Sequence, residues 1–206
     1  MMKVLLLGFG PFLGFQYNPS GKIAEALNGN NIGGFEIAGK VLSVEHVKTS
    51  EEIEAHIRNE RPDAVLCVGL AASKGAITIE RIAINRYCFN DNGNMVDEQI
   101  SDGPAAYFTT LPFERIKAGI ESKGIPAEYS FWGDTYVSNE AFYTIMRLAD
   151  ELGIRQAGFI HVPMPMAQAV ERKNMHMMAR SSAPSMREED EMAAIEAAIE
   201  ACASEL

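Results

Sequence analysis

The sequence predicts an α/β fold: a single-domain, three-layer α/β/α sandwich with a mostly parallel, twisted sheet. Short apolar runs typical of buried strands alternate with segments whose apolar residues recur at helical spacing. This order makes neighbouring strands parallel and covers both faces of the sheet with helices. The 206 residues suit one substantial core, and no repeat or linker divides them, so we expect one domain over residues 1–206.

The first half of the chain alternates strands with helices. Its strand segments are continuous or alternating apolar runs, and a loop rich in Gly and Pro follows the first of them. Thr49 and Glu52 are spaced as a capping box, which predicts that a helix opens at Thr49. We expect strands at residues 4–7, 36–44, 64–68 and 76–84, and helices at residues 20–27 and 49–59.

The second half continues the pattern after a polar turn at residues 90–94. Gly124 and Gly153 each follow a segment of helical periodicity and are expected to end it. Ser185 and Glu188 are spaced as a second capping box, which predicts a final helix from Ser185. We expect strands at residues 127–131 and 157–162, and further helices at residues 113–123 and 138–152.

The composition is that of a globular domain that does not bind nucleic acid. Apolar residues make up 47% and charged residues 22%, and the formal net charge is -10. A nucleic-acid or anionic-membrane partner would require a basic surface. No apolar run approaches the roughly 18 residues of a membrane span. The apolar start ends at Gly8, Gly10 and Pro11 without a cleavage site, so it predicts a strand and no signal peptide.

The three cysteines suggest neither disulfides nor a metal site. The number of cysteines is odd, and no C-x-x-C pair occurs among Cys67, Cys88 and Cys202. This usage fits a reducing cytoplasm, and we expect no metal and no cofactor. Cys67 and Cys202 lie on apolar patterns and are expected in the core, whereas Cys88 lies in a polar loop.

One histidine stands out from the four. His46, His56 and His176 lie in polar surroundings and are expected at the surface. His161 lies within an apolar run near the end of a predicted central strand, where catalytic groups collect in open α/β sheets. A core histidine satisfied by a backbone carbonyl is the alternative.

Two further positions have equally ordinary alternatives. Glu80 beside Arg81 suits an ion pair at a strand end. Ser138 begins a helical pattern, where a capping serine is common, but a nucleophile also gains there from exposed N–H groups and the helix dipole. Spacing alone does not separate these alternatives.

Several motifs in order resemble the pyrrolidone carboxyl peptidase (pyroglutamyl peptidase I) family over nearly the whole chain. This family comprises cytoplasmic cysteine peptidases that remove N-terminal pyroglutamyl residues. The matching stretches are GFGPF at 8–12, NPS at 18–20, VGLA at 68–71, ERIAIN at 80–85, GPAAYF at 103–108, TLP at 110–112, DTYVSN at 134–139, FIHVP at 159–163 and PSM at 184–186.

The resemblance implies a role for each matched residue. Glu80 would orient the general base His161, and position 138 would be the nucleophile. The expected ring-binding residues are Phe9 and Phe12 as the walls of an apolar slot, Asn18, and backbone groups near Leu70 and Ala71. All three catalytic groups are expected to meet at the carboxyl edge of the sheet, with Glu80 and His161 each at a strand end. The implied substrates are N-terminal pyroglutamyl peptides.

The chain departs from the family at three places. Ser138 stands where the family has cysteine, Ser73-Lys74 replaces Gly-Arg, and the loop after Asn85 is about three residues shorter, so that Arg86 either replaces a loop arginine or leaves it missing. A serine hydroxyl is far less acidic than a thiol. Three explanations of Ser138 stay open: an engineered change that stops turnover, a divergent homologue that only binds lactam ligands, and a working Ser-His-Glu hydrolase.

A Met-rich segment at about residues 164–184 interrupts the regular pattern. Its methionines alternate with cations, which suits an arm covered by a neighbouring subunit as well as a flexible segment. The family resemblance also implies homo-oligomers. We therefore expect a homodimer or homotetramer in which this arm packs against another copy.

Overall fold

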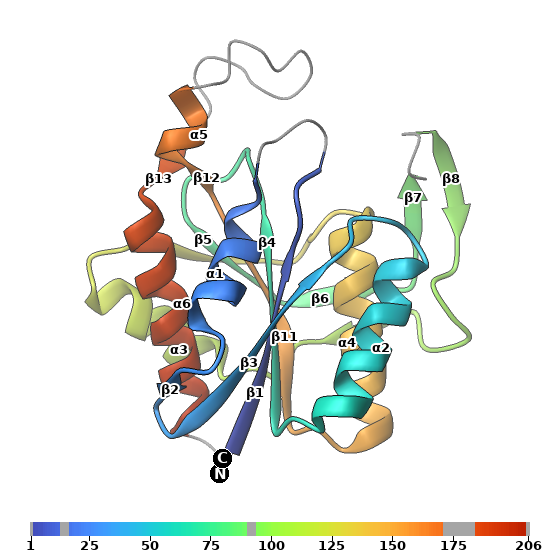
Figure 1. Ribbon diagram of the computed structural model, residues 1–206. Coiled ribbons are helices and arrows are strands. Elements are labelled where there is room, and N and C mark those ends of the chain that lie inside the picture. Colours follow the sequence, from blue (N-terminus) through green and yellow to red (C-terminus); the bar gives the residue numbers. More distant parts are fainter. Residues whose placement is uncertain (1, 13–16, 90–93, 171–183, 205–206) are drawn as a thin grey trace.

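One seven-stranded sheet runs through the middle of the computed structural model, which describes residues 2–12, 17–89, 94–170 and 184–204 (Figure 1). Four central strands are parallel, and β5 at their side runs antiparallel to β11. The predicted mostly parallel sheet is therefore confirmed. Across the sheet the order is β10 (Ala127–Ser130), β5 (Ile77–Glu80), β11 (Gln156–Val162), β4 (Ala64–Leu70), β1 (Met2–Phe9), β3 (Phe35–Leu42) and β2 (Asn31–Ile32).

Helices cover both faces of this sheet, as a three-layer sandwich requires (Figure 1). On one face lie α1 (Pro19–Leu27), α3 (Phe113–Ser122) and α6 (Glu188–Ala203). On the other lie α2 (Lys48–Glu60) and α4 (Val137–Leu152). The remaining short elements are β6 (Ile82–Ile84) with β9 (Ala106–Phe108), β7 (Tyr87–Phe89) with β8 (Met95–Glu98), β12 (Met164–Pro165) with β13 (Ser185–Met186), and α5 (Met166–Val170).

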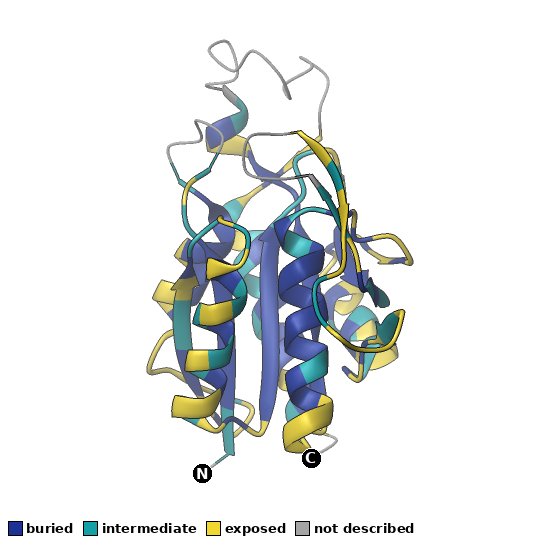
Figure 2. Cartoon of the chain, turned by 90° about the vertical axis from the view of Figure 1, so that its right-hand side faces the viewer, coloured by how far each residue is buried: buried dark blue, intermediate teal, exposed yellow. Residues whose placement is uncertain are grey.

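The central strands are apolar on both sides because helices cover both sides. In β1, Val4 and Leu6 pack under α1 and α6, whereas Leu5 and Leu7 face α2 and α4. Successive side chains of a strand point to opposite faces, so a continuous apolar run is what a doubly covered strand needs. The buried strands form the interior in Figure 2, and exposed residues gather on the outer sides of the helices.

A glycine brings the start of α1 onto the end of β1. A Cβ atom on Gly8 would lie 2.1 Å from the carbonyl oxygen of Ser20, so no other residue fits without a shift of the backbone. This close approach places the loop after β1 beside the N-terminus of α1.

Three local predictions are wrong. Residues 76–84 do not form one strand, because the chain leaves the large sheet at Arg81 and continues as β6 in a separate small sheet. Neither capping box forms. In the first box, the Thr49 hydroxyl donates to the carbonyl oxygen of Ser43 and Glu52 accepts from the Ser43 N–H, so both residues fasten the β3–α2 loop. In the second box, Ser185 lies in β13, before α6 begins.

The ends of the Met-rich segment belong to this chain's own core. Met164 and Met186 are 1% and 8% exposed, respectively, whereas Met166 is 51% exposed. Residues 171–183 of the arm and residues 90–93 of the expected turn lie outside the described part of the chain. No helix among the described residues is long and apolar enough to cross a membrane.

Glu191 in α6 is a buried acid, 1% exposed, and neither carboxylate oxygen has a partner among the described residues. Burial, and then the negative charges of Glu188 and Asp190, raise its pKa from 4.5 to about 9. The folded chain therefore holds this proton more tightly than the unfolded chain. The resulting stabilisation is complete below about pH 4.5 and is lost as the pH rises towards about 9.

Glu191→Gln should remove this pH dependence, because an amide does not ionise. The difference in free energy of unfolding, variant minus parent, should rise by at most about 1.4 kcal/mol per pH unit between about pH 5 and pH 8. Urea unfolding of both proteins across this range measures the difference. A difference that stays constant with pH would contradict a protonated Glu191.

Candidate active site

A buried carboxylate and a buried imidazole face one another across β5 and β11. Glu80 Oε1 lies 2.8 Å from His161 Nδ1, and the two residues are 1% and 6% exposed. Glu80 does not pair with Arg81, because the Arg81 guanidinium stacks on Phe113, 3.3 Å from the ring centroid. His161 is therefore held by a carboxylate, and the alternative with a backbone carbonyl partner does not apply.

The strand direction at this pair differs from our expectation. β5 runs antiparallel to β11, so Glu80 pairs with Phe159 in the middle of β11 and does not reach the carboxyl edge of the sheet. Phe159 and His161 are two residues apart and point to the same face. The Glu80 side chain reaches His161 along this shared face, which is the face that α4 covers.

Ser138 is the second residue of α4, and Tyr136 occupies the capping position without a side-chain hydrogen bond. The alternative in which Ser138 caps the helix therefore does not apply. The first N–H groups of a helix have no partner within the helix, and the helix dipole adds positive potential there. Ser138 thus lies where a developing negative charge would be stabilised.

A small cavity at the carboxyl ends of β1 and β4 brings Ser138 together with Phe9, Phe12, Asn18 and Leu70. Its full lining is Phe9, Phe12, Asn18, Val44, Gly69, Leu70, Tyr136, Val137 and Ser138. Ala71 is not part of this lining, and its N–H donates to the carbonyl oxygen of Val162.

His161 does not line this cavity but lies beside Gly69, which does. The two residues are partners in the β4–β11 register, and a Cβ atom on Gly69 would lie 3.2 Å from His161 Cδ2. Cδ2 is bonded to Nε2, so the imidazole nitrogen that does not face Glu80 lies on the side of Gly69. Within the described chain no hydrogen bond joins Ser138 to His161.

Asn18 fixes the loop that carries Phe9 and Phe12. Its Oδ1 accepts from the Ser20 N–H and hydroxyl at 3.1 and 2.8 Å, and its Nδ2 donates to Gly10 O at 3.2 Å. The Ser20 hydroxyl in turn accepts from the Phe9 N–H at 3.0 Å. The apolar side of the cavity is therefore held by the N-terminus of α1.

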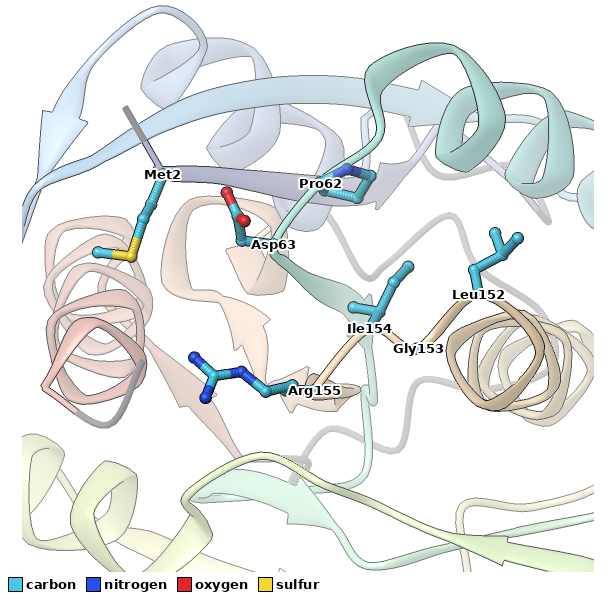
Figure 3. Close-up of a pocket in the computed structure, with 7 residues that line it drawn as sticks. All are labelled: Met2, Pro62, Asp63, Leu152, Gly153, Ile154 and Arg155. Atoms are coloured by element: carbon cyan, nitrogen blue, oxygen red, sulfur yellow. The ribbon is translucent and has the colours of Figure 1, made fainter.

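A larger hollow lies at the opposite, amino edge of the sheet (Figure 3). Figure 3 shows Asp63 and Arg155 there among Met2, Pro62, Leu152, Gly153 and Ile154. Asp63 accepts a hydrogen bond from the Lys3 N–H. None of the predicted site residues lines this hollow, so we place the functional site at the carboxyl edge.

Sequence reasoning gave no role to Asn139, which follows Ser138. Its side chain is 2% exposed, accepts from the Ile84 N–H at 3.0 Å and donates to the carbonyl oxygens of Ile84 and Arg86 at 2.9 and 2.7 Å. Asn139 thereby ties the start of α4 to β6. One pattern in the sequence could have indicated this contact. Two of the motifs that match the family, ERIAIN and DTYVSN, each end in an asparagine, Asn85 and Asn139.

His46 does not lie on the surface as expected. Its side chain is 5% exposed and contacts Glu140, because the β3–α2 loop folds back onto the first turn of α4.

Of the residues that depart from the family pattern, Ser138 lines the cavity, whereas Lys74 and Arg86 do not. The Arg86 side chain is 46% exposed and pairs with Asp97, and Lys74 pairs with Glu128. Asp134 has φ of 71°, and its side chain accepts from the Tyr136 N–H at 2.6 Å. Within the described residues no group of three or more His, Cys, Asp or Glu could hold a metal ion.

The pyroglutamyl peptidase family model matches residues 2–205. The chain belongs to the pyroglutamyl peptidase family. It is 37% identical to the pyrrolidone-carboxylate peptidase of Pyrococcus furiosus over the full length of both chains, and 38% identical to that of Halalkalibacterium halodurans over 85% of this chain and 90% of the relative. A solved structure of a mutant P. furiosus pyrrolidone carboxyl peptidase covers 100% of both chains with a TM-score of 0.92 and 37% identity.

Asn139→Ala should destabilise the chain, because the backbone groups of half-buried Ile84 and exposed Arg86 would lose three hydrogen bonds to a buried side chain. A typical hydrogen bond contributes about 0.5–1.5 kcal/mol, so we expect the free energy of unfolding to fall by about 1.5–4 kcal/mol. Chemical denaturation compares this variant with Asn30→Ala, an exposed asparagine before β2. Equal effects of the two substitutions would show that the Asn139 contacts do not hold the helix start.

Proposed function

We propose that this chain is a pyroglutamyl peptidase that removes pyroglutamate from the N-terminus of peptides, with position 138 as the nucleophile, His161 as the general base and Glu80 as the group that orients His161. The observation that carries the proposal is the buried 2.8 Å contact between Glu80 and His161 beside a cavity that also contains Ser138. The family membership supports the substrate class.

The residues perform acyl transfer in two stages. The Ser138 Oγ attacks the pyroglutamyl carbonyl carbon while His161 Nε2 takes the hydroxyl proton, and Glu80 stabilises the imidazolium through Nδ1–H. The imidazolium then gives its proton to the leaving amine, and the carbon–nitrogen bond breaks. In the second stage His161 takes a proton from water, which attacks the acyl carbon. The bond from this carbon to Ser138 Oγ then breaks, the imidazolium returns its proton to Oγ, and pyroglutamate is released. N–H groups at the start of α4 stabilise the oxyanion in both stages.

The ring of pyroglutamate fits the chemistry of the cavity lining. We assign the apolar walls to Phe9 and Phe12, and the fixed backbone at one end to Asn18 and Leu70. Ala71 supports the turn through its bond to Val162 O and does not itself line the cavity. A small apolar slot with few polar groups suits a neutral lactam, and it excludes a charged N-terminal amine.

A second function, binding without turnover, is favoured by a separate observation. Ser138 and His161 form no hydrogen bond in the described chain, and a serine hydroxyl needs that help more than a thiol does. On this alternative the chain binds pyroglutamyl or other lactam ligands in the same cavity. The two functions differ only in what happens at position 138.

Ser138→Cys should give the faster enzyme, because a thiol has a pKa near 8.5 and is readily ionised beside an imidazole. Hydrolysis of a pyroglutamyl chromogenic amide measures it, with Ser138→Ala as the control that lacks any nucleophile. Adding His161→Gln to Ser138→Cys should lower kcat/KM by about 10²–10⁴-fold. A folded Ser138→Cys protein without activity would show that position 138 is not the nucleophile or that the altered loops prevent turnover.

Calorimetry with pyroglutamate separates the two functions. Binding to the chain as written, without turnover of the chromogenic amide, supports the binding function. Turnover by the chain as written, at a rate above that of Ser138→Ala, rules it out.

We also propose a cytoplasmic homodimer or homotetramer in which the Met-rich arm contacts another copy. The exposed Met166 supports the contact between copies. The three free cysteines support the cytoplasmic location. Light scattering at micromolar concentration should give a mass of two or four chains, and a single-chain mass would refute the assembly.

A further inference from the structure

A second histidine–glutamate pair lies behind the cavity wall. His46 Nδ1 is 2.5 Å from Glu140 Oε2, and the two side chains are 5% and 4% exposed. Glu140 Oε1 accepts from the Val47 N–H at 2.9 Å and from the Ser50 hydroxyl at 2.7 Å. Both oxygens of this carboxylate are therefore used, and all three donors come from one short stretch, residues 46–50. The pair fastens that stretch to the first turn of α4.

The backbone between the two partners is strained. Val47 has φ of 63° and ψ of -53°, and the Lys48 N–H donates to His46 O at 2.7 Å, which together define a γ-turn with positive φ. A β-branched residue in this region is a conformational outlier. Strain of this kind persists only where the surroundings over-determine it, and it concentrates at functional sites. Here the Val47 N–H bond to Glu140 holds the strained turn.

The strained turn controls one wall of the cavity. Val44, three residues before it, lines the cavity, as does Tyr136 at the start of α4. The His46 ring meets Tyr136 edge-on at 5.3 Å between centroids and stacks on Tyr87 at 4.1 Å. The histidine thus fills the space between the β3–α2 loop, the small β7–β8 sheet and α4. A shift of His46 would remove a ring contact of Tyr136 and move the loop that carries Val44.

We propose that His46 and Glu140 are positioning residues that set the width of the ring cavity by holding Val44 and Tyr136 in place. They do not contact the reacting atoms in this assignment, which rests on the proposed function for its ligand, a pyroglutamyl lactam. The polar pair suits this task because hydrogen bonds fix a loop in one position, whereas apolar contacts allow it to slide.

Glu140→Ala in the Ser138→Cys background tests the assignment. Without Glu140 the turn at Val47 relaxes and the cavity widens, so KM for the chromogenic amide and the Kd for pyroglutamate should both rise about tenfold or more, since small misplacements at a binding wall are costly. We expect kcat to change less than about threefold, because Glu80 and His161 are untouched. Glu140→Gln keeps an acceptor for Val47 and Ser50 and should lie between parent and Glu140→Ala.

Thr144→Val is the matched control. Thr144 is buried one turn further along the same helix face and bonds to Ser50 at 3.0 Å, but it does not line the cavity. Thr144→Val should lower thermal stability and leave KM and Kd unchanged. A Glu140→Ala protein that loses stability while its KM and Kd match those of Thr144→Val would overturn the positioning role.

A ligand-independent measurement separates this inference from the proposed function. In spectra of protein with isotope-labelled valine and tyrosine, Glu140→Ala should shift the Val44 methyl and Tyr136 ring resonances, and Thr144→Val should leave them in place. Unshifted Val44 and Tyr136 signals would overturn the inference even if the enzyme is active. Shifted signals in a protein whose parent neither binds pyroglutamate nor turns over substrate would support the positioning role and refute the proposed ligand.

Discussion

The buried contact between Glu80 and His161 is the constraint on which the arrangement of this site depends. A carboxylate inside an apolar sheet is costly unless a partner compensates it. The antiparallel register of β5 against β11 supplies that partner, because it sets Glu80 opposite Phe159 and lets the carboxylate reach the imidazole two residues on. If β5 ran parallel to β11, this register would not exist, and a carboxylate would have to reach His161 from another strand position. The one antiparallel junction among the inner strands is therefore where the acid and the base meet.

The first turn of α4 carries Ser138 and is the second constraint on the cavity. Consecutive side chains attach the turn on two sides: Asn139 to β6, and Glu140 to the β3–α2 loop. Ser138 follows Val137, which also lines the cavity, and precedes these two anchoring residues. Its own side chain makes no such hydrogen bond within the described chain. A hydroxyl that is held in place by its neighbours and has no structural bond of its own is available for reaction. This division between anchored and unanchored side chains follows from helix geometry, since residues in successive positions point in different directions.

Much of this fold was predictable from sequence because it rests on periodicity. The apolar runs at β1, β4 and β11, and the glycine that ends α4, are local patterns with local causes, and the structure confirms them. Strand direction was not predictable, because nothing in the residues of β5 records that it runs antiparallel. The capping boxes failed for a similar reason: Thr49 and Glu52 have the right spacing, but tertiary contacts with Ser43 compete successfully for their polar atoms. The buried His46 was missed because its partner is about 90 residues away, where no local pattern can reveal it.

The two histidine–glutamate pairs show how satisfaction of hydrogen bonds distinguishes a working carboxylate from a structural one. Both pairs are buried, and both flank the start of α4. Glu140 has every oxygen occupied and stabilises one loop conformation. Glu80 has Oε2 without a partner in the described chain, and Gly133 is the backbone that lies against it. A buried carboxylate oxygen without a partner is costly, so each such oxygen requires an explanation. Under the proposed function Glu80 acts on His161, whereas Glu140, bonded through both oxygens to residues 46–50, holds a loop.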